Sequence, residues 1–183
     1  MKFFRLLPML FLFPLFAVQT DDEEEDKTVH WSADRPLTWA DFSGAVDTKK
    51  EYDAWTYAGV NYVYSWYYDE NDEIGLDLNA WAYFDPAQSW VRKGKMTAEL
   101  LAHEQVHFDI AQLHCLYFIE TAEASTYTVE IENELGKIFN IYYADLLAMQ
   151  IQYDLETEHF KNKTAQKEWT EKIKKEISDL MSR

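Results

Sequence analysis

Residues 103–107 read His-Glu-Gln-Val-His, and these residue types at this spacing are typical of a catalytic zinc site. On a helix, His103 and His107 lie on one face about 6 Å apart, so both imidazoles can bind one metal ion. Glu104 lies about 100° further round the helix, where it can touch a water on the metal without binding the metal. Zinc lowers the pKa of such a water to about 7, and the carboxylate takes its proton. The motif therefore predicts one Zn²⁺ per chain, with His103 and His107 as ligands and Glu104 as general base.

A catalytic zinc needs a third protein ligand, and the nearest histidine is badly placed for this role. His114 lies seven residues beyond His107, about 10 Å along a straight helix. A bend could bring it back, but there is no glycine between Gly94 and Gly136. We therefore interpret His114 as a structural residue.

The third ligand is expected further along the chain. If the first helix ends near residue 126 and a second helix returns beside it, residues 145–160 come level with the two histidines of the motif. His159 is the only imidazole in this stretch, and we predict it as the third ligand. Asp154 and Glu156 are the alternatives.

Three further side chains on the predicted helices have expected roles. Tyr153 could polarise a substrate carbonyl or stabilise its oxyanion, and we list it with Glu104 as a catalytic candidate. The chain has 12 tyrosines, so a packing role for Tyr153 is the alternative. Asp109 is about 200° round the helix from His107 and should point away from the metal. Cys115, the single cysteine, is expected to be a buried free thiol.

The histidine motif must be held by helices that follow a region rich in aromatic residues. Residues 54–68 and 74–84 alternate apolar and polar side chains around a polar loop, which predicts a long hairpin, with a further strand near residues 28–31. From Thr97 the apolar period changes to 3.6, which predicts helices from Thr97 to about residues 121–126, over 129–153 and over 164–181. Strands followed by helices indicate an α+β domain.

Composition bounds the class of protein. The chain has 183 residues with 17 Lys and Arg against 33 Asp and Glu, which gives a formal net charge of −16. This charge argues against nucleic acid and anionic membranes as partners.

Residues 1–19 have a basic start and an apolar stretch too short to span a membrane, so we predict a signal peptide. Residues 20–29 are expected to be an acidic disordered linker, and residues 30–183 a single domain. We expect an exported protein, periplasmic or extracellular, and a monomer.

Four blocks of sequence resemble a known bacterial family: LTWADFSG at 37–44, SWV at 89–91, LLAHEQVHFDI at 100–110 and YDLETEH at 153–159. The family consists of uncharacterised exported proteins described as predicted secreted zinc-dependent proteases. The resemblance implies a zincin-like domain with His103 and His107 as ligands and Glu104 as base, and it makes Asp109 a family residue. His159 matches a family histidine that is usually followed by glycine, where this chain has Phe160.

These observations favour a zinc metallopeptidase in which a zinc-bound water, activated by Glu104, attacks a peptide bond. Its partner would be a peptide or protein substrate, which could pair with an edge strand of the aromatic hairpin. The main alternative is a non-catalytic binding or structural protein of the cell envelope that has a structural or relic zinc site. A zinc hydrolase that acts on another amide, for example in peptidoglycan, is a third hypothesis. Glu104 separates the first two, because only a catalytic site needs it.

Overall fold

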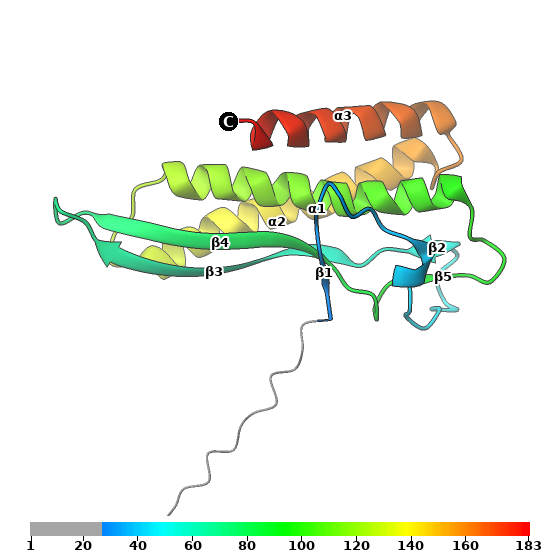
Figure 1. The fold of residues 1–183 in the computed structure, drawn as a ribbon, viewed down its shortest axis with the longest axis horizontal. Helices are drawn as coiled ribbons and strands as arrows, with labels where there is room; N and C mark the ends of the chain where they lie inside the picture. Colours follow the sequence, from blue (N-terminus) through cyan, green and yellow to red (C-terminus); the bar gives the residue numbers. More distant parts are fainter. Residues whose placement is uncertain (1–26) are drawn as a thin grey trace, which may run out of the picture.

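The structure is a computed structural model that describes residues 27–183, so the predicted signal peptide and most of the acidic linker lie outside the described residues. The fold is α+β, as predicted, with short and long strands followed by three helices (Figure 1). No helix in residues 27–183 has the length and apolarity needed to cross a membrane. In chain order the elements are β1 (Val29–His30), the 3₁₀ turn η1 (Trp39–Asp41), β2 (Ala54–Trp55), β3 (Ala58–Tyr68), β4 (Ile74–Phe84), β5 (Trp90–Val91), α1 (Ala98–Ala124), α2 (Ile131–Thr157) and α3 (Lys163–Met181).

The predicted hairpin forms the main sheet. Strands β3 and β4 pair antiparallel without a bulge from Ala58 opposite Phe84 to Tyr68 opposite Ile74. Strand β1 pairs with the other edge of β4, which gives the order β1-β4-β3. Apolar side chains alternate along these strands, and those of Leu76 and Leu78 pack toward the helices.

The hairpin is shorter at its start than the sequence predicts. We expected one strand over residues 54–68, but residues 54–55 pair with β5 in a separate two-stranded sheet. The chain changes partner at Thr56 and Tyr57, where the Tyr57 amide donates to the hydroxyl of Ser89 instead of to a strand. Strand propensity cannot reveal this exchange, because it depends on a partner more than 30 residues away.

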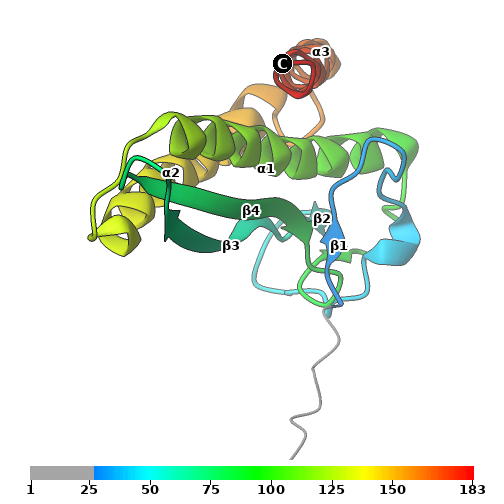
Figure 2. The ribbon, with the colours of Figure 1, turned by 60° about the vertical axis from the view of Figure 1, so that its left-hand side comes forward.

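Helix α1 is the centre of the domain. It lies between the main sheet and α3, and Figure 2 shows these three layers from the side. The hydroxyl of Thr97 caps its start by accepting from the Leu100 amide at 3.1 Å. Phe108 packs against Phe84 of the sheet, while Ile110 packs in the cluster formed with α3. A helix that is buried on several faces can place polar side chains deep inside the domain.

Helix α2 returns beside α1 in the opposite direction, as the fold-back prediction requires (Figure 1). It ends at Thr157, four residues beyond the predicted end at Tyr153, and Glu158 closes it in the left-handed conformation. Position 154 is therefore on the helix rather than in the loop after it.

His114 is buried among the helices, with an exposed fraction of 4%, and neither ring nitrogen has a hydrogen-bond partner within the described residues. Burial lowers its pKa below the ordinary 6.5, although the charges of Asp145 and Glu176 oppose this shift. The unfolded chain therefore binds a proton at His114 more readily than the folded chain does, and the stability that neutral His114 permits is lost as the pH falls through about 6.5.

We expect His114→Leu to reduce the loss of stability between pH 7 and pH 5 by about 1 kcal/mol, because a leucine has no proton to bind and no polar atom to bury. The free energy of unfolding, measured in urea at both pH values, checks this. An equal loss in the variant and the wild type would contradict it.

Candidate metal centre

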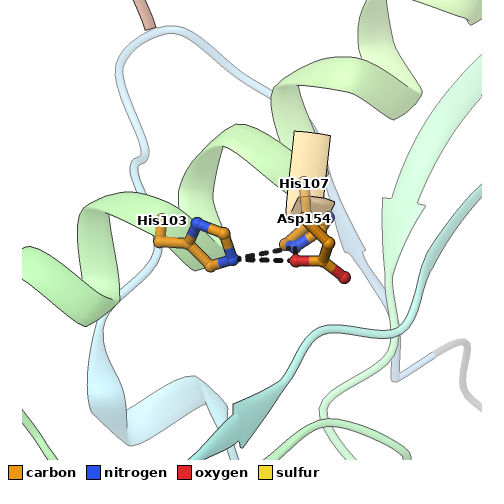
Figure 3. Close-up of side chains that lie close together, drawn as sticks. All are labelled: His103, His107 and Asp154. Atoms are coloured by element: carbon orange, nitrogen blue, oxygen red, sulfur yellow. Dashed lines mark hydrogen bonds and ion pairs between the residues drawn. The ribbon is translucent and has the colours of Figure 1, made fainter. Parts of the chain in front are cut away.

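Three side chains converge between α1 and α2 (Figure 3). The Nε2 atoms of His103 and His107 are 3.2 Å apart, and Oδ1 of Asp154 lies 3.1 Å from the first and 3.2 Å from the second. A tetrahedral ion with bonds of about 2.0–2.1 Å has ligand atoms about 3.3 Å apart. The three atoms therefore form nearly one face of such a tetrahedron, and they lie within metal-binding distance of one another.

Two glutamine side chains orient the histidines. The Gln166 carbonyl oxygen lies 2.9 Å from Nδ1 of His103, and the Gln150 carbonyl contacts Nδ1 of His107. Because an amide oxygen only accepts, each Nδ1 carries the hydrogen and each Nε2 of a neutral ring has a free lone pair. Gln150 is held in turn, since its Nε2 donates to the His107 carbonyl at 2.9 Å.

The convergence of these lone pairs calls for a cation. Two neutral imidazole nitrogens and a carboxylate oxygen cannot satisfy one another, because none of the three brings a hydrogen. The pKa shifts show that a positive charge, from a proton or a metal ion, is favoured between these groups. Burial raises the pKa of Asp154, but contacts with both histidines outweigh it and hold the pKa well below its usual range. Burial lowers the pKa of His107, yet the contacts with Asp154 and the charge of Glu104 raise it overall. The group therefore fits a metal ion.

Glu104 lies beside this group in a fixed position. The residue is buried, and its Oε2 accepts a hydrogen bond of 2.6 Å from the hydroxyl of Thr56. Thr56 is available for this because it lies between the strand of the small sheet and the first strand residue of the main sheet, and is paired in neither. Thr56 could not be recognised from the sequence, since a threonine within a stretch of strand formers gives no signal of its own.

A cavity of about 420 Å³ opens onto the group. Its lining comes from residues 52–58, from α1, from α2 and from residues 159–160. The lining residues are Tyr52, Asp53, Ala54, Trp55, Thr56, Tyr57, Ala58, Leu100, His103, Glu104, His107, Tyr143, Leu146, Leu147, Gln150, Ile151, Asp154, His159 and Phe160. The metal-binding atoms and the Glu104 carboxylate thus share one accessible space.

Known proteins offer no guide to this site. No family model matches the chain, and comparisons with curated proteins and with solved structures find no significant match. Function must therefore be inferred from the geometry of the residues.

His159, the predicted third ligand, lies next to the group but outside it. Its Nδ1 is 3.1 Å from Oδ1 of Asp154, and its ring packs against Tyr52 with a centroid distance of 4.9 Å. It is not one of the residues whose ligand atoms all lie within 4.8 Å of one another. Glu158, His159 and Phe160 all have positive φ angles, of 51°, 50° and 66°. Phe160, where the similar family usually has glycine, thus adopts a conformation that favours glycine.

Tyr153 and Glu156 face other partners. Tyr153 is fully buried, its ring is stacked on His103, and its hydroxyl donates to Gln166 at 2.7 Å. It does not line the cavity, and burial raises its pKa strongly. Glu156 accepts a hydrogen bond of 2.7 Å from the Trp169 indole. Tyr153 therefore supports the His103 ring and is not part of the proposed catalytic group.

Asp109 anchors a distant segment. Its Oδ1 accepts from the Trp31 indole at 2.9 Å and from the Gln105 side chain at 2.8 Å. Gln105 also accepts from the Leu37 amide at 2.7 Å. Asp109, two residues after the histidine motif, thus fastens the chain before the hairpin onto α1, which explains a buried carboxylate on this helix.

Proposed function

We propose that this chain is an exported zinc-dependent metallopeptidase with a zincin-like domain, in line with its resemblance to the family of predicted secreted proteases. His103, His107 and Asp154 would hold the ion. Zinc is the best match because it takes nitrogen and oxygen ligands in tetrahedral geometry and keeps an open position in catalytic sites. The distances of 3.1 to 3.2 Å between the three ligand atoms support this choice.

Each group around the ion has its own role in the proposed hydrolysis. Zinc, when bound, supplies a Lewis acid that lowers the pKa of water and polarises a carbonyl. Glu104 takes the proton of the attacking water and later passes it to the leaving amine. Thr56 holds the Glu104 carboxylate in place, and the residues that line the cavity hold the peptide next to the three ligand atoms.

The observation that carries the proposal is the position of Glu104. A buried carboxylate that lines the same cavity as three potential ligand atoms can act on a metal-bound water, whereas a structural site is closed by four protein ligands and needs no such group. This favours the peptidase over the alternative of an envelope protein with a structural zinc. A monomer with a peptide or protein substrate remains our expectation.

The direct test is hydrolysis of a mixed peptide library by protein purified without the predicted signal peptide and loaded with one equivalent of zinc. We expect new peptide termini in mass spectra, loss of cleavage after treatment with a chelator, and recovery when zinc is added back. A chain that binds zinc but cleaves nothing in the library would favour the structural alternative.

The hydroxyl of Thr56 should affect the rate of peptide hydrolysis but not the affinity for zinc. We expect Thr56→Val to lower kcat for a peptide substrate about tenfold with little change in KM, because Glu104 loses the bond that orients it. Thr56→Ser keeps a hydroxyl and should retain most of the activity. A similar loss of kcat in both variants, or loss of zinc from Thr56→Val, would contradict an orienting role.

A further inference from the structure

The cavity, which we call the groove, is lined by two unlike segments, which we refer to as its walls. One wall consists of seven consecutive residues, 52–58, and the other is a face of α2, with His103, Glu104 and His107 between them. A groove bounded by an extended segment suits an extended chain, which can lie along it and cross the metal-binding group.

The α2 wall is apolar and exposed. Tyr143, Leu147 and Ile151 are spaced by four residues and so share one face of the helix, and their exposed fractions are 37%, 49% and 63%. Apolar side chains gathered in a concave surface mark a binding site more strongly than single exposed ones do. Ile141 on the same helix is 60% exposed but does not line the groove, which makes it a matched control.

The groove offers no permanently cationic side chain to an acidic occupant. Its lining residues include no lysine or arginine, so a peptide carboxylate would lose its hydration without gaining a partner. On the α2 wall, the amide of Gln150 already contacts the ring and the carbonyl of His107. These features favour an apolar peptide side chain over an acidic one.

We propose that the α2 wall formed by Tyr143, Leu147 and Ile151 selects the substrate by binding a large apolar side chain, such as leucine or phenylalanine, next to the bond to be cleaved. This inference rests on the proposed peptidase function and names its substrate class: extended peptides with a large apolar residue at the cleavage site. Peptides with an acidic residue at that position bind poorly.

Binding can be measured separately from cleavage in the zinc-loaded Glu104→Gln protein. Two capped pentapeptides are titrated by NMR, identical except for a central leucine or aspartate among alanines. We expect the leucine peptide to bind at least tenfold more tightly than the aspartate peptide. Adding Leu147→Ser should weaken binding of the leucine peptide about tenfold, whereas Ile141→Ser should change it less than twofold.

The outcomes separate this proposal from the function on which it rests. Equal effects of Leu147→Ser and Ile141→Ser, or equal binding of both peptides, would overturn the selection by the α2 wall. So would a dimer that Leu147→Ser disrupts without an effect on peptide binding, because the face would then be an interface between two copies. If binding follows the expected pattern while the zinc-loaded wild type cleaves no peptide, the selection of peptides by the α2 wall is confirmed and the peptidase function is wrong. Circular dichroism of each variant verifies the fold.

Discussion

Glu104→Gln is expected to lower the hydrolysis of peptides about a thousandfold while leaving zinc bound. A general base contributes roughly 10²- to 10⁴-fold to such reactions, and the amide of glutamine cannot take a proton from water. The substitution keeps the size of the side chain and an oxygen that can accept from Thr56, so the fold and the groove should be preserved. The ion depends on His103, His107 and Asp154, not on Glu104.

The measurement pairs kcat/KM for one peptide found in the library with the zinc content of the same preparation. Glu123→Gln, the same substitution at an exposed position of α1 outside the groove, serves as a control for general effects of substitution. Full activity in Glu104→Gln would remove the general base from the proposal. Loss of zinc together with activity would show that Glu104 acts on the metal rather than on the water.

Local patterns were sufficient to predict the arrangement of the helices. The start of α1 at Thr97, the break after Ala124 and the return of α2 all follow from period, capping and chain geometry. The same reasoning brought residues 145–160 to the histidine motif, a stretch that includes Asp154. These features are predictable because they depend on short segments that fix their own conformation.

The details of the site depend on contacts between distant segments. Gln166 reaches His103 from α3, and Thr56 reaches Glu104 from the point where the chain changes sheets. Glutamine and threonine are common on surfaces, so neither gives a sequence signal for an orienting role. The sequence could not reveal whether Asp154 or His159 lies closer to both histidines of the motif, because this depends on how far α2 continues before its left-handed end.

Asp154→Ala is expected to lower the affinity for zinc by about a thousandfold or more, and His159→Ala by only about tenfold. Removing Asp154 takes away one of three ligand atoms that lie within 3.2 Å of one another. His159 contacts the carboxylate rather than the group as a whole, and residues that only support a ligand typically contribute about 10- to 100-fold. Competition with a chromophoric zinc chelator at pH 7 measures both affinities.

Glu156→Ala is the matched control, because Glu156 is a carboxylate two residues from Asp154 on the same helix but bonds to Trp169 instead. Its affinity for zinc should stay within about twofold of the wild type, since it supplies no atom to the group. If His159→Ala releases zinc and Asp154→Ala retains it, the ligand set is His103, His107 and His159, as the sequence first indicates. That set would require the His159 ring to leave Tyr52, and the positive φ angles of residues 158–160 would then mark the turn that moves it.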